Sequence, residues 1–316
     1  MPTPALHRTE HRLVVSAPAD QLYALVADVT RWPAVFEPNL HVHHLERGER
    51  QERFRLWALL NGTVKSWTSR RELDPVQRTV SFEQEVSQPP VASMGGQWRL
   101  EPLPDGRTEV VLLHHFSAVD DDPDTVAWID KAVDGNSEKE LAALRSVAER
   151  AENIDDVVFS FEDAVRSSGS AADCYDFVNR ADLWADRLPH VQAVSLREDE
   201  PGVQELQMDT VTEGGATHTT RSYRICQSGA WIAYKQVVLP ALLSGHSGLW
   251  TFREDAGTTT VTARHTVAIK VEAVEEVLGA GSTLADARQF VRSALGNNSL
   301  TTLKHASEHA AGKGGR

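Results

Sequence analysis

The sequence predicts an α+β fold made of two tandem copies of one unit, each a curved antiparallel sheet wrapped around a long C-terminal helix. Three observations support this fold class. Landmark residues recur at a constant spacing, apolar and polar residues alternate along many short segments, and each half closes with a long stretch of helical periodicity. A chain of 316 residues is long enough for two domains that each bury a core.

The internal repeat is visible in residues that recur 152 positions later. The pairs at this spacing are Trp32 with Trp184, Gln84 with Gln236, and Gly96-Gln97-Trp98 with Gly248-Leu249-Trp250. Slightly different spacings relate Pro38-Asn39 to Pro189-His190, Ser69-Arg70-Arg71 to Ser222-Tyr223-Arg224, and His114 to His265. We therefore expect a boundary near residue 153, with one domain over 1–153 and a second over 154–316.

The elements of each copy follow in the same order. A first strand, near residues 11–16 or 157–163, leads into a short helical stretch that ends at the Trp32 or Trp184 turn, where prolines follow. Alternation then predicts strands over 40–47, 52–60, 64–73, 79–86, 96–101 and 109–118 in the first copy. Asn61-Gly62 and Asp105-Gly106 read as hairpin turns. Helical spacing predicts the final helix over 137–152.

Such a sheet and helix bury each other's apolar faces and leave a cavity where they do not meet, an arrangement called a helix-grip architecture. In the strand over 64–73, a period of two places Trp67, Ser69 and Arg71 on the inner face. A guanidinium in an apolar cavity costs desolvation free energy, so Arg71 calls for a polar ligand or a buried partner. The alternative is that Arg71 reaches the rim and meets water.

The same parity places further side chains on the cavity wall. In the first copy these are Val80, Phe82, Gln84, Val86, Trp98 and His114; in the second they are Ser222, Ile232, Tyr234, Gln236, Trp250 and His265. The second copy leaves open whether Arg224 or Arg221 faces inward, because Tyr223 and Ile225 face outward if Arg224 faces in. An aromatic wall with sparse polar groups suits a mostly planar ligand with several carbonyl oxygens.

Composition excludes several classes of function. A net charge of −13 disfavours nucleic acid or an anionic membrane as a partner. The two cysteines form no CxxC motif, no signal sequence or apolar run of spanning length occurs, and a cytoplasmic protein is expected. No glycine-rich phosphate loop, dinucleotide fingerprint or complete metal-ligand set appears, so we expect neither a cofactor nor a metal.

The landmarks resemble those of a known family. Trp32-Pro33, the Trp67-Thr68-Ser69-Arg70-Arg71 strand and Asn136, with Trp184, Ser222-Tyr223-Arg224 and Asn298 in the second copy, are similar to the didomain aromatase/cyclases of bacterial aromatic (type II) polyketide synthases. These proteins carry START-like helix-grip domains. The resemblance implies a poly-β-ketone, often reduced at carbon nine, held on an acyl carrier protein. It also implies aldol closure of the first ring between carbons seven and twelve, dehydration to an aromatic ring, and other minimal synthase subunits as partners.

The resemblance also suggests roles for individual residues. It implies that Arg71 is the principal catalytic arginine and that Trp32, Trp67 and Ser69 line its pocket. Asn39, and His190 in the second copy, stand where single-domain relatives present a tyrosine after the Trp-Pro turn, which leaves the proton donor open.

A mechanism follows as a hypothesis. Arg71 and Arg224 would each stabilise oxyanions in their own copy. His114, His190, Tyr234 or His265 would move protons. The side chains expected to hold or flank the substrate are Trp32, Trp67, Ser69, Phe82, Gln84, Trp98, Asn136, Trp184, Ser222, Gln236, Trp250 and Asn298. One copy would close the ring and the other assist aromatisation. The alternative function is a non-catalytic helix-grip carrier of an apolar or aromatic small molecule.

Overall fold

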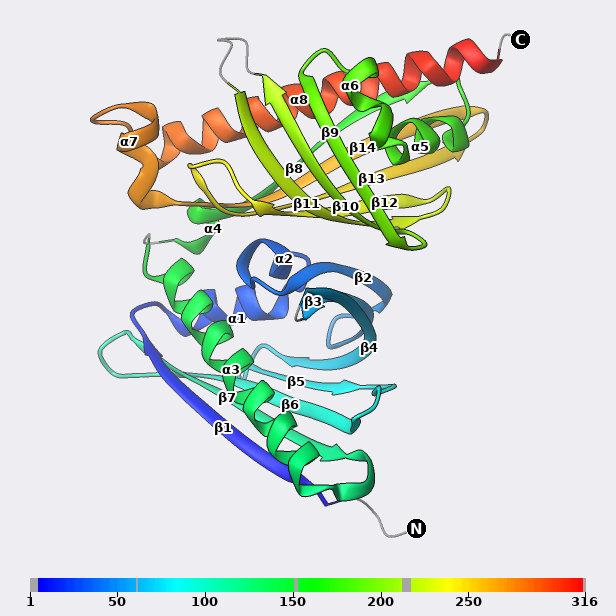
Figure 1. Cartoon of the computed structure of the whole chain (residues 1–316). Coiled ribbons are helices and arrows are strands. Elements are labelled where there is room, and N and C mark those ends of the chain that lie inside the picture. Colours follow the sequence, from blue (N-terminus) through cyan, green and yellow to red (C-terminus); the bar gives the residue numbers. More distant parts are fainter. Residues whose placement is uncertain (1–4, 61, 151–152, 212–216, 315–316) are drawn as a thin grey trace. The chain divides into compact units, whose positions relative to one another are not determined.

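The chain divides into two compact units, Met1–Asp155 and Asp156–Arg316, which are described separately (Figure 1). The structure is a computed structural model, and it describes residues 5–60, 62–150, 153–211 and 217–314. In Figure 1 a long helix, α3 in the first unit and α8 in the second, lies along a curved sheet.

The first unit is one antiparallel sheet with its helices. Its elements are β1 (His7–Val15), α1 (Ala19–Ala27), α2 (Trp32–Val35), β2 (Asn39–Arg47), β3 (Gln51–Leu60), β4 (Thr63–Asp74), β5 (Thr79–Gln84), β6 (Val91–Pro102), β7 (Thr108–Ala118), the 3-10 turn η1 (Val119–Asp121) and α3 (Pro123–Ala148). The sheet has seven strands in the order β1-β7-β6-β5-β4-β3-β2. The first strand therefore pairs with the last, and the remaining strands form a meander.

The second unit repeats this plan after the short helix α4 (Ile154–Val157). Its elements are β8 (Val158–Ser167), α5 (Ala171–Asn179), η2 (Ala181–Leu183), α6 (Trp184–Arg187), β9 (Val191–Glu200), β10 (Val203–Val211), β11 (Thr217–Gln227), β12 (Trp231–Val238), β13 (Leu243–Asp255), β14 (Thr258–Ile269), η3 (Val271–Ala273), α7 (Val274–Leu278) and α8 (Leu284–Gly314). The strand order, β8-β14-β13-β12-β11-β10-β9, matches the first sheet position by position. The predicted tandem α+β fold is confirmed.

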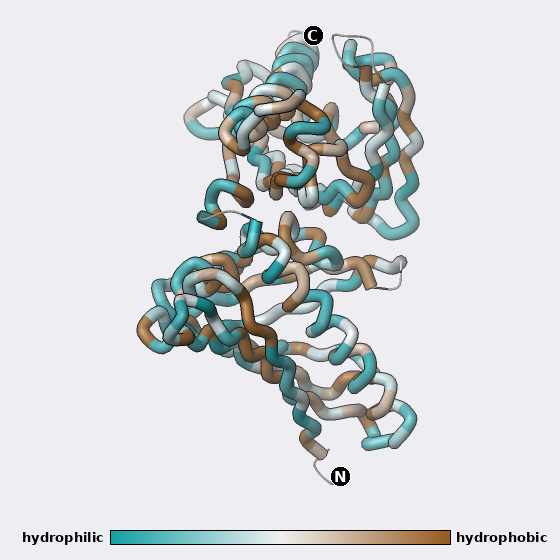
Figure 2. The backbone as a smooth tube through the Cα atoms, turned by 90° about the vertical axis from the view of Figure 1, so that its left-hand side faces the viewer, coloured by the Kyte–Doolittle hydropathy of each residue, from teal (hydrophilic) through white to brown (hydrophobic). Residues whose placement is uncertain are grey.

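The sequence pattern explains why the sheets curve around their helices. Along β14, Val261, Ala263 and Val267 are buried with His265 between them, as the alternation predicts. Helix α8 presents Leu303, Ala306 and Ala310 to the same core, which also contains Phe177 and Trp250. Its hydrophilic positions are prominent towards the C-terminal end in Figure 2. Mutual burial of one sheet face and one helix stripe is the main stabilisation of each unit.

The final helix of the first unit is longer than the sequence interpretation expected. Helix α3 begins at Pro123, not at residue 137, because Asp122 caps it by accepting a hydrogen bond from the Thr125 amide at 2.9 Å. An aspartate followed by proline is a strong start signal. Asn136 therefore lies in the middle of α3 rather than opening it, and its side chain is exposed.

Two smaller expectations can be compared with the structure. Gly106 has a φ of +83°, as the predicted Asp105-Gly106 turn requires, whereas Asn61 of the other predicted turn lies outside the described residues. The inward placement of Val86 is wrong. Strand β5 ends at Gln84, so the alternation stops there and Val86 is 70% exposed.

Shortening a buried side chain of α8 in the core of the second unit tests this packing. Leu303→Ala should lower the free energy of unfolding by about 3 kcal/mol, because Leu303 is fully buried and the truncation leaves a cavity. Urea denaturation followed by tryptophan fluorescence measures the change. Leu300→Ala, at a half-buried position of the same helix, is the control and should cost clearly less. Equal losses for the two variants would contradict the predicted packing of α8.

Candidate functional site

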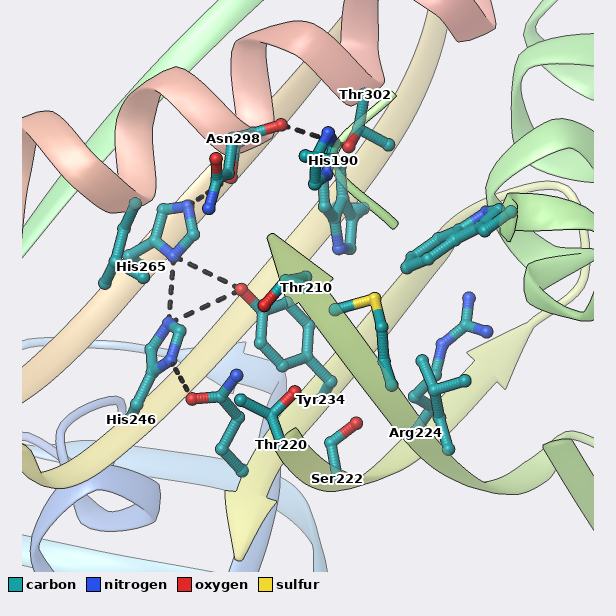
Figure 3. Close-up of a pocket in the computed structure, with 17 residues that line it drawn as sticks. His190, Thr210, Thr220, Ser222, Arg224, Tyr234, His246, His265, Asn298 and Thr302 are labelled. Atoms are coloured by element: carbon teal, nitrogen blue, oxygen red, sulfur yellow. Dashed lines mark hydrogen bonds between the residues drawn. The ribbon is translucent and has the colours of Figure 1, made fainter. Parts of the chain in front are cut away.

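The second unit contains a cavity between its sheet and helix α8 (Figure 3). The space among the lining side chains, with the open mouth included, is about 700 Å³. The wall combines aromatic, aliphatic and polar side chains: Trp184, His190, Leu206, Met208, Thr210, Thr220, Ser222, Arg224, Tyr234, Gln236, His246, Trp250, His265, Leu295, Asn298, Ser299 and Thr302. All nine residues that the sequence analysis predicted for this unit's site are among them.

Arg224 lies on the inner face of this cavity, which answers the question that the strand pattern left open. The residue is 2% exposed, whereas the side chain of Arg221 is 45% exposed. The Arg224 guanidinium donates to the carbonyl oxygens of Val178 at 2.7 Å and Asn179 at 3.4 Å, the last two residues of α5. It also lies 5.3 Å from the ring centre of Trp184.

A chain of polar side chains faces Arg224 from the far wall of the cavity (Figure 3). His246 Nδ1 is 2.8 Å from Gln236 Oε1, and His246 Nε2 is 3.0 Å from His265 Nδ1. On its other side, His265 Nε2 is 2.6 Å from Ser299 Oγ on α8. The Tyr234 hydroxyl is 3.2 Å from His265 Nδ1 and 3.5 Å from His246 Nε2. The two imidazoles stack with their centres 5.3 Å apart.

Burial determines the protonation of these groups at neutral pH. Desolvation lowers the pKa of His265 to about 4, and desolvation together with the charge of His265 lowers the pKa of His246 well below its usual value. Desolvation raises the pKa of Tyr234 above its ordinary range and lowers that of Arg224. At pH 7 the cavity therefore contains the neutral imidazoles of His246 and His265, a protonated phenol and a guanidinium, so it offers both proton acceptors and donors.

The Gly-x-Trp pattern that occurs in both copies of the repeat has a steric explanation. A Cβ atom added to Gly248 would lie 2.3 Å from two ring carbons of Tyr234, and one added to Gly96 would lie 2.5 Å from Phe82 Cζ. The two glycines leave room for an aromatic ring on the neighbouring strand. In the second unit that ring is the one whose hydroxyl reaches His265.

The first unit satisfies its inward arginine differently. Arg71 is 2% exposed, and its guanidinium donates to the carbonyl oxygens of Val26 at 2.9 Å and Ala27 at 2.5 Å, at the end of α1. Arg71 Nε also donates to Glu52 Oε1 at 2.8 Å. Glu52 Oε2 lies 2.8 Å from His44 Nε2. Arg71 thus has a buried carboxylate partner, one of the two solutions that the sequence argument allowed.

Glu52 and its counterpart mark a charge difference between the two units. Glu52 pairs with Arg71 across β3 and β4, and Gln204 pairs with Arg224 across β10 and β11. The Gln204 amide donates to Glu198 at 2.8 Å and to the side-chain oxygen of Asn179 at 3.4 Å. Among the described residues, no carboxylate forms a hydrogen bond or ion pair with Arg224. The positive charge is therefore compensated in the first unit and uncompensated by a direct partner in the second.

Apart from Val86, which is exposed, the other residues predicted for the first unit lie where the sequence analysis placed them, with one exception. Ser69 and Trp98 are buried, and Trp67 packs on the cluster of Val29, Val42, Phe54 and Leu56. Trp32 lies 5.0 Å from the Arg71 guanidinium. His114 contacts Phe82 and lies 3.4 Å from Ser137 Oγ, and Gln84 is half-buried. The exception is Asn136, whose exposed position mid-helix leaves Ser137 to face the core. A hollow borders Glu52, Arg71 and Phe82, and the space among its lining side chains, with the open mouth included, is about 980 Å³.

Three residues of the candidate sites were not predicted from the sequence, although the sequence contains patterns that point to them. His246 lies two residues before Gly248 on the inward parity of β13, and Ser299 follows Asn298. Glu52 lies opposite Arg71 in the hairpin whose strands pair from Leu60 and Thr63, and the predicted Asn61-Gly62 turn would give this register. Within the described ranges, no three side chains of histidine, cysteine, aspartate or glutamate gather as metal ligands. None of the helices described combines the length and apolar character that a bilayer crossing needs.

A curved sheet around a long helix defines a helix-grip domain, and this chain has two. In the second, a polar-lined cavity lies between the sheet and the helix. Comparison with known proteins specifies the family. Models described as "Polyketide cyclase / dehydrase and lipid transport" match residues 7–149 and 168–291. The chain is 55% identical to the granaticin polyketide synthase bifunctional cyclase/dehydratase of Streptomyces violaceoruber, over 98% of this chain and 96% of the relative.

Further relatives agree. The chain is 53% identical to the actinorhodin polyketide synthase bifunctional cyclase/dehydratase of Streptomyces coelicolor, over 98% of this chain and 99% of that protein. The solved structure of the di-domain ARO/CYC BexL from the BE-7585A biosynthetic pathway matches with a TM-score of 0.85 and 52% identity, covering 96% of this chain and 98% of that one. The chain belongs to the polyketide cyclase/dehydrase family and is an enzyme of the cyclase/dehydratase class.

The buried ion pair of the first unit leads to a pH-dependent prediction. Burial raises the pKa of Glu52, but the hydrogen bond from His44 and the charge of Arg71 outweigh it and leave the pKa below its ordinary value. A carboxylate with a lowered pKa stabilises the fold above its unfolded-state pKa, and this contribution disappears as pH falls through the folded-state pKa. Glu52→Gln should therefore cost about 3 kcal/mol near pH 7, and the difference should shrink below about pH 4.

Urea denaturation of the wild type and Glu52→Gln from pH 7 to pH 3 measures this difference. Glu72→Gln, an exposed position on the neighbouring strand β4, is the control and should have little effect at any pH. A Glu52→Gln loss that stays constant through acid pH would show that the ionised carboxylate is not the cause.

The glycine that accommodates Tyr234 gives a steric prediction. Gly248→Ala should push the Tyr234 ring away from His265, because the new Cβ would overlap the ring. A crystal structure of the variant should show the distance from the hydroxyl to His265 Nδ1 increased beyond hydrogen-bonding range. Gly312→Ala on α8 is the control, since nothing lies within 4 Å of its Cβ position. An unmoved Tyr234 in Gly248→Ala would refute the steric role.

Proposed function

We propose that this enzyme closes and dehydrates the first ring of a poly-β-ketone bound to an acyl carrier protein, as part of an aromatic type II polyketide synthase in the cytoplasm. The relatives are named as bifunctional cyclase/dehydratases of the granaticin and actinorhodin polyketide synthases, which supports this assignment. The specific reaction we propose is aldol closure between carbons seven and twelve of a chain reduced at carbon nine. The two domains, 1–153 and 154–316, would divide the work.

The observation that carries the proposal is the buried guanidinium of Arg224, which has no direct carboxylate partner and shares a cavity with two imidazoles and a phenol. In an aldol closure, negative charge grows on the enolate oxygen and then on the oxygen of the attacked carbonyl. A preorganised cation in a dry cavity stabilises both oxyanions. Ser222, beside Arg224, and Gln236 would hold neighbouring carbonyl groups, with Trp184 and Trp250 confining the chain.

Dehydration requires an acid and a base on the same intermediate. A base removes the proton from the carbon next to a carbonyl, the carbon–oxygen bond of the adjacent hydroxyl group breaks, and an acid protonates the departing hydroxyl to give water. We assign the acid role to Tyr234 and the base role to the neutral imidazole of His265, which then returns a proton to the phenolate. His190 and Asn298, which line the same cavity, would contact the substrate rather than the proton chain.

We assign a different role to the corresponding positions of the first unit. Arg71 is neutralised by Glu52, and the ring at the Tyr234 position is Phe82, which has no hydroxyl. This favours a substrate-folding role for the first unit, with Trp32, Trp67, Ser69, Gln84 and Trp98 as its wall and His114 as a weaker proton carrier. Desolvation lowers the pKa of His114 to about 4. Ring-closure chemistry at Arg71 remains the prediction from the family resemblance.

Reconstitution with a minimal synthase and its acyl carrier protein tests the arginines. Arg224→Ala should reduce the rate of first-ring product formation about 100- to 1,000-fold, the cost of removing one oxyanion donor. Arg71→Ala should have the smaller effect on rate and the larger effect on stability. Arg221→Ala, on the same strand but exposed, is the matched control and should behave as wild type. Unchanged products and rates in both Arg224→Ala and Arg71→Ala would refute the proposed mechanism.

A second variant separates dehydration from ring closure. Tyr234→Phe converts the second cavity to the residue of the first and removes the proposed acid. Mass spectrometry should show a cyclised product heavier by one water accumulating, while the ring still closes. Phe82→Tyr in the first unit is the reciprocal variant and should not restore dehydration. Complete dehydration by Tyr234→Phe at the wild-type rate would exclude Tyr234 as the acid.

A further inference from the structure

We propose that His246 is a positioning residue that holds His265 in the tautomer with its proton on Nδ1, so that Tyr234 keeps its own proton for the substrate. The inference rests on the proposed function and adds to it a residue whose hydrogen bonds, among the described residues, are to Tyr234, Gln236 and His265. His246 is 1% exposed, and no part of the mechanism above depends on which of its nitrogens carries the proton.

The direction of the hydrogen bonds follows from Gln236. Its Oε1 atom can only accept, so the proton between it and His246 belongs to His246 Nδ1, at 2.8 Å. A neutral imidazole has one proton, so His246 Nε2 must be an acceptor. The atom 3.0 Å away, His265 Nδ1, must then be the donor. His265 Nε2 is consequently unprotonated and accepts from the Ser299 hydroxyl at 2.6 Å.

This arrangement has a consequence for Tyr234. Its hydroxyl oxygen lies 3.2 Å from His265 Nδ1. Because that nitrogen is protonated, its N–H is shared between two acceptors, His246 Nε2 and the Tyr234 oxygen. The phenol proton is therefore not needed by His265. Its one other neighbour in the network, His246 Nε2, is at the longer distance of 3.5 Å, so the proton is available to the cavity. After proton donation, the phenolate faces an N–H donor that stabilises it.

Without His246, the opposite tautomer becomes competitive. His265 Nε2 could carry the proton and donate it to Ser299, and His265 Nδ1 would then accept the Tyr234 proton. The hydroxyl proton of Tyr234 would then point away from the substrate, although the side chains themselves would not move. The first unit illustrates this simpler state. Met94 stands where the second unit has His246, 152 residues apart, and Phe82 stands at the position of Tyr234.

Three substitutions at one position provide the test. His246→Met reproduces the residue of the first unit and removes the acceptor. His246→Gln places an amide oxygen near the position of Nε2 and can accept from His265, whereas the shorter His246→Asn reaches only the Nδ1 position. For dehydration by the reconstituted synthase, we expect kcat to fall 10- to 100-fold in His246→Met and His246→Asn with KM unchanged, and to recover in His246→Gln.

A second readout is the tautomer itself, which a purely structural role would not change. In protein labelled with ¹⁵N-histidine, long-range ¹H–¹⁵N spectra distinguish protonated Nδ1 from protonated Nε2. We expect the His265 proton on Nδ1 in the wild type and in His246→Gln, and on Nε2 in His246→Met. Met94→Leu in the first unit is the control and should change neither kcat nor the His265 signals.

Two results would overturn the inference: a wild-type His265 with its proton on Nε2, or a His246→Met variant with unchanged kcat. If His246→Met does not fold, the His265 tautomer of the wild type and the comparison of kcat between His246→Gln and His246→Asn still test the inference. The outcome is separable from that of the proposed function. Were Arg224→Ala and Tyr234→Phe to leave ring closure and dehydration intact, the proposed function would fail, whereas the His265 tautomer would still be read directly from the spectra.

Discussion

The structure depends on one recurring interaction: a buried arginine that joins the sheet to the end of a helix. Arg71 donates to the carbonyl oxygens of Val26 and Ala27, the last two residues of α1. Arg224 donates in the same way to Val178 and Asn179, the last two residues of α5. The last carbonyl groups of a helix lack intrahelical partners and carry partial negative charge, so a cation there is stabilised. The same bonds hold each guanidinium against a tryptophan and fix the wall of the cavity.

The two units share this frame but not its electrostatics. Glu52 supplies the carboxylate that compensates Arg71, whereas neutral Gln204 occupies the matching position beside Arg224. Phe82 and Met94 are replaced by Tyr234 and His246. All three differences add proton-transferring groups or leave positive charge available in the second cavity. A duplicated fold can thus keep its packing while a few inward positions decide which copy has the groups for proton transfer.

The arrangement also shows how a site can be polar without losing stability. His246 and His265 each have both nitrogens within hydrogen-bonding distance of a partner, which limits the cost of burying them. Gly248 provides the space that brings the phenol to this network, and α8 provides Ser299. The chemistry therefore draws on β12, β13, β14 and α8 together, and none of these elements contains the site by itself.

The sequence by itself determined the tandem α+β fold and the inward faces of most strands, because a two-residue period and a repeat of fixed spacing are local properties of the chain. That was sufficient to place Arg71, Tyr234 and His265 on cavity walls. The helical periodicity from residue 137 onward did not set the start of α3, which the Asp122-Pro123 cap determines, or show that Asn136 is exposed. The partner of each buried charge was decided only by the tertiary structure. Whether a guanidinium meets Glu52 or a pair of helix carbonyls depends on strand register and helix placement, which bring together residues far apart in the chain.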